Sequence, residues 1–321
     1  MQRFQNILLV VEPDADNGTA LNEAAMLAAD NGAKLTIIDV VDRLPADLQM
    51  AITAVLPDEL IKLVIAERRE VISGLKASAL QSGVPSVKSS VLTGRRFLEA
   101  IKAVQRDRHD LLIKAAVNQP GLLRVLSSTD MHILRKCPCP VWMVRAKSGM
   151  PQRRVLAAVD FEPEESDTAA LNREIVSLAS SLAAKYAADW HLVHAWRLPH
   201  ERFLRSARSG LKAAEVNALA LQERRKRSQW LQALLDEPAA ADGGETAGAG
   251  RIQLREGDPK VEVPRAAKEL EIDLVVMGTL GRVGIPGYFI GNTAEEILEQ
   301  VGCSVLAIKP AGFVSPVHTE D

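Results

Sequence analysis

The sequence predicts an α/β protein made of two similar halves, each a parallel β-sheet with helices on both faces. Three observations support this fold class. Short apolar runs alternate with longer amphipathic stretches along the chain, a pattern typical of successive β-α-β units. The apolar runs are hydrophobic on both faces, as strands of a covered parallel sheet are. Segments of the first half recur in the second half in the same order, which indicates an internal repeat.

Three pairs of segments carry the repeat: "NILLVVEP" (6–13) with "RVLAAVDFEP" (154–163), "AERREVISGLKA" (66–77) with "QERRKRSQWLQA" (222–233), and "STDMHILRKCPCPVWMVRA" (128–146) with "NTAEEILEQVGCSVLAIKP" (292–310). The chain has 321 residues, a length that suits two domains with a core each. We predict one domain at residues 1–147 and a second at 153–311, joined where glycine, proline and charge interrupt the periodic pattern.

The first half is expected to open with a strand and to alternate strands with helices. Strands are predicted at apolar runs too short for helices, namely 7–11, 35–41, 87–92, 110–116 and 141–144. Helices are predicted at the stretches between them, the second of which is long and amphipathic, namely 20–31, 58–82, 97–107 and a last one before the fifth strand.

The second half repeats this order. Its strands are predicted at 155–159, 190–196, 251–254, 273–277 and 305–308, and its helices at 171–184, 213–235, 261–270 and directly after a glycine-rich loop. Asp258 followed by Pro259 is typical of a helix N-cap with proline in the first turn. Trp190, His194 and Trp196 alternate on one face of a strand, as core residues do.

The glycine-rich loop lies in "MGTLGRVGIPGYFIGNTAEEI", residues 277–297. It follows a buried strand and precedes a helix that Asn292 or Thr293 is expected to cap, with Glu295 and Glu296 as capping-box partners. A helix start presents unpaired N–H groups, and glycine lets an anion approach them closely. The stretch therefore suits phosphate, although a plain flexible connector is the alternative for a glycine loop taken alone.

The position of this loop in the sheet favours a binding site. In open parallel sheets a ligand lies outside the carboxyl ends of the strands where the strand order reverses. If the first strand of the second half is central, its neighbours are the second and fourth strands. The three strand ends then carry Asp160, Ala195 and the glycine loop, so we expect these features to converge.

At this point the second half resembles a universal stress protein domain. The similar motifs are "LAAVD" on the first strand, "LVHA" on the second, "EGDP" after the third, and the spacing of Gly278, Gly281 and Gly291. That spacing is the family's ATP-binding signature, which ends with serine or threonine where this chain has Asn292. Two such halves resemble the tandem type of the family. The resemblance covers nearly the whole chain and implies sheets with strand order 3-2-1-4-5.

The resemblance also implies a ligand, ATP or the related AMP or ADP, with or without Mg²⁺. Asp160 would sit by the adenosine, and Ala195 would face the adenine through its backbone. The phosphates and ribose would lie along the loop and the helix start. The residues implied there are Met277, Gly278, Gly281, Arg282, Gly291, Asn292 and Thr293. An asparagine amide can donate a hydrogen bond where a hydroxyl would, while Arg282 is as readily explained as a solvated loop residue.

The first half departs from the signature. An offset of 164, which matches Thr129 to Thr293, places Lys114, Val117 and Ser127 at the three glycine positions, and Glu12 takes the place of Asp160. Side chains there restrict positive φ and close approach. We therefore predict a first half that is degenerate for ATP and structural or regulatory. Lys114 is interpreted as a surface lysine rather than as part of another anion pocket.

Composition narrows the function further. The net charge of −2 provides no overall attraction to nucleic acid, and the basic cluster at 223–227 is interpreted as a solvated helix face. No apolar stretch approaches the roughly 20 residues that cross a bilayer. We expect a cytoplasmic protein that binds neither nucleic acid nor membrane. Its three cysteines, Cys137, Cys139 and Cys303, are expected to be buried thiols rather than a disulfide framework or a metal site.

The leading hypothesis is a stress-response protein that binds an adenine nucleotide in its second half and has a regulatory or protective role. Its halves are expected to pair as a pseudo-dimer within the chain, and a homodimer of whole chains is plausible. Two alternatives stay open. One is an interaction scaffold with vestigial pockets, which the departure at Asn292 favours. The other is an enzyme on the same scaffold, including a slow ATPase, because phosphates at a helix start gain electrostatic help.

Overall fold

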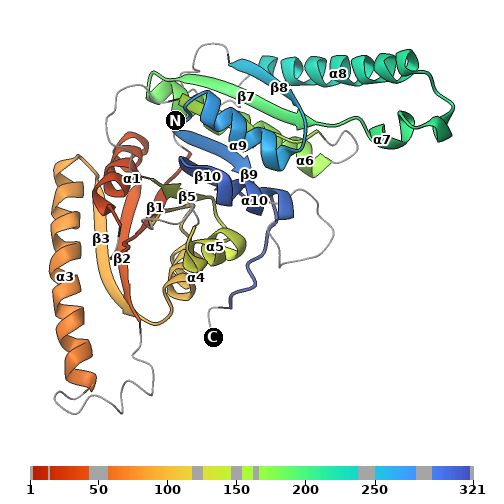
Figure 1. Cartoon of the computed structure of the whole chain (residues 1–321). Helices are drawn as coiled ribbons and strands as arrows, with labels where there is room; N and C mark the ends of the chain where they lie inside the picture. The colour runs from red at the N-terminus through yellow and green to blue at the C-terminus, as the bar shows by residue number, and fades with distance from the viewer. Residues whose placement is uncertain are drawn as a thin grey trace. The chain divides into compact units, whose positions relative to one another are not determined.

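The computed structural model describes residues 3–13, 15–42, 57–117, 126–145, 154–161, 166–237, 250–279 and 291–318 (Figure 1). The chain divides into two compact units. The first comprises residues 1–148, 284–290 and 304–321, and the second comprises 149–283 and 291–303. The predicted join near 146–153 lies outside the described residues. We describe each unit by itself.

The first unit contains the predicted parallel sheet. Its strands are β1 (Asn6–Val10), β2 (Lys34–Val41), β3 (Ser86–Thr93), β4 (Leu111–Ala115) and β5 (Val141–Val144). They lie in the order β3-β2-β1-β4-β5 with every pair parallel, so the predicted order 3-2-1-4-5 is confirmed in this half. Strand β1 is central, and its last residue, Val10, is in register with Ile38 on one side and Lys114 on the other.

Helices cover both faces of this sheet (Figure 1). They are α1 (Asn17–Asn31), α3 (Pro57–Gln81), α4 (Arg96–Asp107) and α5 (Ser128–Lys136). Helices α1 and α3 contact each other on one face, and α4 and α5 do so on the other. Helix α1 begins where the Asp16 side chain accepts from two backbone N–H groups and ends at Gly32, whose φ is 61°. The helix boundaries are therefore set by local cap chemistry.

The second unit repeats this arrangement. Its strands are β6 (Arg154–Ala158), β7 (Asp189–Trp196), β8 (Arg251–Glu256) and β9 (Leu274–Gly278), in the order β8-β7-β6-β9 with every pair parallel. Its long helices are α6 (Ser166–Lys185), α8 (Ala213–Asp236), α9 (Pro259–Glu269) and α10 (Asn292–Gln300). Asp258 caps α9 and Pro259 is its first residue, as predicted. The four-residue helix α7 (Glu201–Leu204) and a 3-10 turn (Ala207–Ser209) were not predicted, because segments this short show no periodicity.

The last strand, β10 (Ser304–Ile308), belongs to the first unit. It pairs with β5 in antiparallel register, with Leu306 opposite Trp142. The Ser304 hydroxyl accepts from the backbone N–H of Arg145 at 3.0 Å. The strand predicted to close the second half is thus present, but its pairing with β5 places residues 304–318 with the first half of the chain. This antiparallel pairing with β5 was not predicted.

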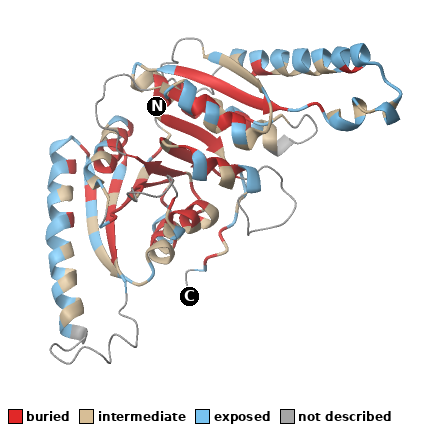
Figure 2. Ribbon diagram, viewed as in Figure 1, coloured by how far each residue is buried: buried red, intermediate tan, exposed pale blue. Residues whose placement is uncertain are grey.

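The core follows the inner strands, such as β1, β4, β7 and β9, whereas the outermost strands β3 and β8 are mostly exposed or half-buried (Figure 2). Trp190, His194 and Trp196 are buried, as predicted. The outer face of α3 is exposed, and Leu63 retains 65% of its accessible surface. Residues 224–226 of the basic cluster are exposed, as predicted, but Arg227 is half-buried and lies over the Trp196 ring. In the first unit, Arg68 of α3 reaches Asp39 on β2.

In the described part of the chain, we find no helix with both the length and the hydropathy needed to cross a bilayer.

Candidate functional site

Three strand ends meet in the second unit where the sequence predicted a crevice. Strand β6 is central, with β7 on one side and β9 on the other. Its last residue, Ala158, is in register with Val193 and with Met277. Asp160, Ala195 and Gly278 therefore follow at one edge of the sheet, and the structure brings these predicted residues together.

Asp160 is exposed, and its backbone is held in place by Asn172 of α6. The Asn172 amide donates to the Asp160 carbonyl at 2.6 Å, and the Asp160 N–H donates to the Asn172 amide oxygen at 3.3 Å. One carboxylate oxygen of Asp160 accepts from the Phe161 N–H at 2.9 Å. Asn172 fixes the path of the chain at the end of β6. It was missed in the sequence, although Asn17 makes the same pair of bonds to Glu12 in the first unit.

Ala195 presents its backbone toward the end of β6. The Val193 carbonyl accepts from the Val159 N–H on the β6 side, whereas the Trp196 carbonyl accepts from the Gly257 N–H on the β8 side. Because successive residues of a strand direct their peptide groups to opposite neighbours, the N–H and C=O of Ala195 face the β6 side. Strand β6 has ended there, and these two groups have no partner in the part of the chain that the structure describes. They are available to a ligand.

Met277 and Gly278 end β9 beside the end of β6. Met277 is buried. Gly278 packs against α6, and a Cβ placed on it would lie 2.8 Å from Cδ2 of Leu171. A side chain at this position would therefore have to displace the end of Leu171, whereas glycine fits without a shift and also permits close approach of a ligand. Gly281 and Arg282, the other two predicted loop residues, lie outside the described residues.

Helix α10 begins beside the same strand ends. Its N-cap is Gly291, and no side chain caps it, so the predicted capping by Asn292 or Thr293 is wrong. The Gly291 N–H donates to the Thr279 carbonyl at 2.9 Å, which brings the helix start to the end of β9. Asn292 and Thr293 are then the first helical residues, and both are exposed.

The first turn of α10 keeps free donors as a result. Its first backbone bond runs from the Glu295 N–H to the Gly291 carbonyl at 3.0 Å, so the N–H groups of residues 292–294 lack partners within the helix. Glu296 does not reach back to the cap, because it pairs with Lys260 of α9 at 2.5 Å. An uncapped helix start with a partial positive charge suits an anion.

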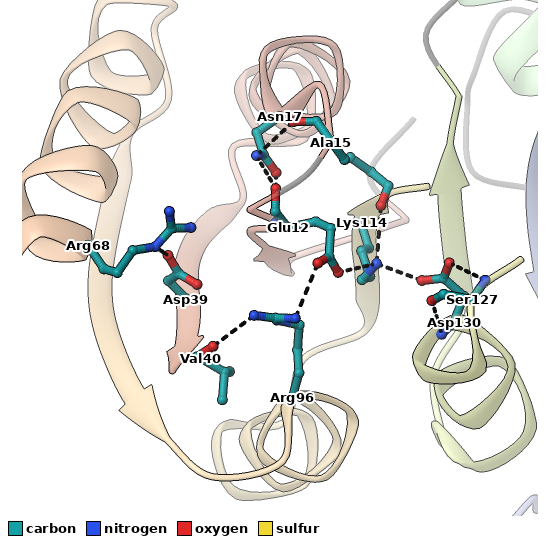
Figure 3. Close-up of polar contacts among 11 residues, drawn as sticks. Glu12, Ala15, Asn17, Asp39, Val40, Arg68, Arg96, Lys114, Ser127 and Asp130 are labelled. Atoms are coloured by element: carbon teal, nitrogen blue, oxygen red, sulfur yellow. Dashed lines mark hydrogen bonds and ion pairs between the residues drawn. The ribbon is translucent and has the colours of Figure 1, made fainter. Parts of the chain in front are cut away.

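The corresponding place in the first unit contains a buried ion cluster (Figure 3). The Lys114 Nζ lies 2.7 Å from a Glu12 carboxylate oxygen and 2.6 Å from Oδ1 of Asp130. It also donates to the Ala115 carbonyl at 3.2 Å. Lys114 and Asp130 are completely buried. The interpretation of Lys114 as a surface lysine is therefore wrong, since two carboxylates from distant parts of the chain compensate its charge.

The two carboxylates of the cluster, Asp130 and Glu12, have further partners. Asp130 also forms a capping box with Ser127 at the start of α5, a reciprocal pair of bonds to each other's backbone N–H. Arg96 of α4 reaches the second Glu12 oxygen at 3.2 Å and donates to the Val40 carbonyl at 3.0 Å. Figure 3 shows Glu12 between the two cations. The charged side chains at these strand ends are thus paired with one another through hydrogen bonds and ion pairs.

The strand registers correct the alignment of the two halves. Val10 is opposite Lys114, whereas its counterpart Ala158 is opposite Met277. Lys114 therefore corresponds to Met277, and Gly278 corresponds to Ala115 rather than to Lys114. The offset is 163 along these strands and 164 at the helix starts, where Ser127 and Gly291 are the N-caps. The single offset of 164 was wrong here because the connection from strand to helix is one residue longer in the second half.

The same comparison explains the role of Arg96. Gly94 and Gly257 follow the third strand in the two halves and have nearly equal φ values, 151° and 154°. Arg96 therefore corresponds to Pro259, and Val40 corresponds to Ala195. In the first unit Arg96 donates a hydrogen bond to the Val40 carbonyl at the end of the second strand. In the second unit Pro259 has no side-chain donor, so it cannot form this bond to the Ala195 carbonyl.

A buried histidine adjoins the second site. The Nδ1 of His194 lies 3.1 Å from the Val159 carbonyl, so this nitrogen carries the proton. The ring packs against Phe161 and Trp230. Burial lowers the pKa of His194, an effect opposed by the Val159 bond and the charge of Asp160 and reinforced by Arg227. Burial thus favours the neutral form of a ring that lies close enough to Asp160 to feel its charge.

Comparison with known proteins gives one consistent relationship. The universal stress protein family matches residues 3–145 and 152–309. "Universal stress protein E" of Salmonella typhi is 31% identical over all of this chain and 99% of its own length. The Haemophilus influenzae "Universal stress protein E homolog" is 28% identical, over 96% of this chain and 98% of its own.

Solved structures agree with this fold. A putative universal stress protein from Pseudomonas aeruginosa UCBPP-PA14 has a TM-score of 0.64 at 24% identity, over 96% of this chain and 94% of its own. A universal stress protein from Archaeoglobus fulgidus DSM 4304 has a TM-score of 0.61 at 17% identity, over 97% and 99%. The chain therefore belongs to the universal stress protein family and carries two copies of the family's domain in tandem.

Proposed function

We propose that the second unit binds an adenine nucleotide, ATP or its relatives AMP and ADP, and that this binding serves a regulatory or protective role in the stress response. The single observation that carries the proposal is the start of α10. It offers three backbone N–H groups without helical partners, and no side chain caps it. A triphosphate is the kind of ligand that such a start accommodates.

The residues present also fit the other end of a nucleotide. An adenine ring needs a donor and an acceptor side by side, and the backbone of Ala195 presents both beyond the end of β6. Asp160 is exposed at the same edge, with its backbone fixed by Asn172. Its carboxylate can accept from ribose hydroxyls. A magnesium ion, if bound with the phosphates, would offset part of their charge and polarise them.

The first unit lacks the uncapped helix start and the unpaired backbone groups described above, so we propose one nucleotide per chain. Its strand ends are filled by the Lys114 cluster, and Arg96 occupies the Val40 carbonyl. The start of α5 is closed by the Ser127–Asp130 capping box, whereas that of α10 has no side-chain cap. Each of the three features that support binding in the second unit thus has a blocked counterpart in the first.

Isothermal titration of the whole chain with ATP and Mg²⁺, and with AMP and ADP, tests the proposal. Asn292→Asp places a carboxylate beside the proposed phosphates, and we expect affinity to fall at least about tenfold, or about 1.4 kcal/mol. The matched control is Ser128→Asp, the same change at the first residue of α5, which we expect to leave affinity unchanged. Because residue 292 is exposed, its substitution does not disturb the core.

The alternatives give different results in the same experiment. An interaction scaffold with vestigial pockets predicts no binding of any of the three nucleotides at millimolar concentration, which would refute the proposal. Rapid release of phosphate from ATP would instead favour an enzyme on this fold over a regulatory binder. Asn292→Ser restores the family signature and is expected to bind at least as tightly as the natural chain.

A further inference from the structure

Two cysteines face each other where α5 ends. Cys137 is the C-cap of the helix and is completely buried, and Cys139 follows after Pro138 with 7% of its surface exposed. Their sulfur atoms are 3.5 Å apart, close enough for an S–H···S hydrogen bond. Neither cysteine is in a disulfide. The chain bends at Pro138 and Cys139, which directs both side chains to the same side.

A buried cation approaches the same place from another part of the chain. Lys309 follows β10, and its Nζ donates to the carbonyls of Leu134 and Arg135 at 2.5 and 3.4 Å. These carbonyls belong to the last turn of α5, immediately before Cys137. Lys309 is buried, and its charge acts on the Cys137 sulfur. The charge of Lys309 favours a thiolate at Cys137, and it opposes the negative end of the α5 dipole at the same place.

The two thiols are not equivalent. Burial raises the pKa of Cys137, but hydrogen bonds from the Cys139 thiol and N–H, together with the charge of Lys309, outweigh it, so the net pKa lies below the usual value. The Cys139 pKa is raised, first by sharing its proton with Cys137 and then by burial. The lowered pKa makes Cys137 the thiol that more readily becomes the nucleophilic thiolate, and Cys139 the partner thiol in contact with it.

The second half provides a natural control. In the alignment of α5 with α10, Cys139 corresponds to Cys303 and Cys137 corresponds to Val301. Cys303 is also buried, beside β10. It has no cysteine two residues before it. The paired arrangement is therefore a feature of the first half alone.

We propose that Cys137 and Cys139 are a redox pair that hydrogen peroxide, or another small hydroperoxide, converts to a disulfide. The Cys137 thiolate attacks one peroxide oxygen, the O–O bond breaks, and a sulfenic acid and hydroxide form. The Cys139 thiol then attacks the Cys137 sulfur, the S–S bond forms, and hydroxide leaves and takes the thiol proton. Two thiols and one hydrogen peroxide give one disulfide and two waters, with the sulfurs oxidised and the peroxide reduced.

The sulfur–sulfur distance and the burial of both cysteines limit which oxidants can react with them. A disulfide bond measures about 2.05 Å, so the sulfurs must close by about 1.5 Å. Both lie under the surface, so the oxidant must be small and the end of α5 must open locally to admit it. A bulky oxidant such as glutathione disulfide does not fit this description. The proposal is independent of nucleotide binding.

Peptide mapping of the peroxide-treated whole chain tests the proposal. Trypsin cleaves after Lys136 and after Arg145, so residues 137–145 form one peptide that contains both cysteines and not Cys303. After peroxide, denaturation and alkylation, we expect this peptide to be unalkylated and lighter by two hydrogen atoms. Dithiothreitol should restore both alkylation sites. Sulfoxide at Met143 adds an oxygen and is distinguishable by mass.

Variants separate the proposed chemistry from general oxidation. Cys303→Ser should leave the rate unchanged, and Lys309→Met should slow disulfide formation about tenfold, because the thiolate loses its cation. Cys139→Ser should trap the sulfenic acid at Cys137, where dimedone labels it. The proposal is overturned if the 137–145 peptide keeps two alkylated cysteines under peroxide that modifies Cys303, or if Lys309→Met folds normally and oxidises at the natural rate.

Discussion

Lys114 and Met277 hold the same position in the two halves of the chain, each opposite the last residue of a central strand. Lys114 is buried in contact with two carboxylates, whereas Met277 is buried without a charge. The counterpart of Asp130 at the helix start is Ala294, which is also apolar and buried. One half thus fills its strand ends with its own ions. The other has one exposed carboxylate there, Asp160, and apolar residues in place of Lys114 and Asp130.

We expect Lys114→Met to lower the free energy of unfolding by about 3–5 kcal/mol, because it leaves the Asp130 carboxylate buried without a cation and leaves Glu12 with Arg96 alone. Urea denaturation measures the loss. The triple variant Lys114→Met, Glu12→Gln, Asp130→Asn removes all three charges and should recover most of it. A loss below about 1 kcal/mol in the single variant would contradict a compensated buried cluster.

Arg96→Ala should cost about 1–3 kcal/mol of stability, because it removes hydrogen bonds to the Glu12 carboxylate and the Val40 carbonyl in a half-buried setting. The neighbouring Arg95 is exposed, and Arg95→Ala provides the control in the same urea experiment. Equal effects of the two substitutions would argue against a specific role for Arg96.

We expect the lowered pKa of Lys309 to make the stability of the fold depend on pH in the alkaline range. Burial lowers its pKa from 10.5 to about 8. The unfolded chain therefore binds more protons than the folded chain between these values, and stability rises with pH across this window. The whole pKa shift, from 10.5 to about 8, corresponds to about 3 kcal/mol of unfolding free energy. Comparison of natural and Lys309→Met chains by urea denaturation from pH 7 to 10.5 isolates the lysine, and parallel curves would disprove the assignment.

We expect the lowered pKa of His194 to make the stability of the fold depend on pH in the acid range. Its lowered pKa, caused mainly by burial, keeps the folded ring neutral while the unfolded histidine gains a proton as pH falls below its usual 6.5. Stability should therefore decrease as pH falls below this value. In His194→Gln, whose amide can still donate to the Val159 carbonyl, this component should disappear from unfolding curves measured between pH 7 and 5. A variant that keeps the same acid dependence would exclude His194 as its source.

Much of the fold could be predicted because its signals are local and repeated. Apolar runs such as Ile7–Val10 and Leu274–Met277 mark strands directly. The Asp258–Pro259 cap depends only on neighbouring residues. The repeat of both patterns identified tandem domains before any contact was known.

The errors arose where distant residues decide the outcome. The burial of Lys114 depends on Glu12, which is 102 residues away in sequence, and on Asp130 in a later helix. No local pattern reveals such a pair. The cap of α10 depends on where the loop delivers Gly291 against Thr279. Asn17 and Asn172 could have been found, since an asparagine near the start of the first helix occurs in both halves.

Hydrogen exchange of the whole chain with and without ATP and Mg²⁺ tests the asymmetry of the two halves most directly. The amides of residues 292–294 lack helical partners and Ala195 faces an open strand end, so all four should exchange rapidly in the free protein. We predict that nucleotide protects them while the start of α5 and the end of β2 stay unchanged. Protection in the first unit, or in neither unit, would contradict a single nucleotide site formed by the second half.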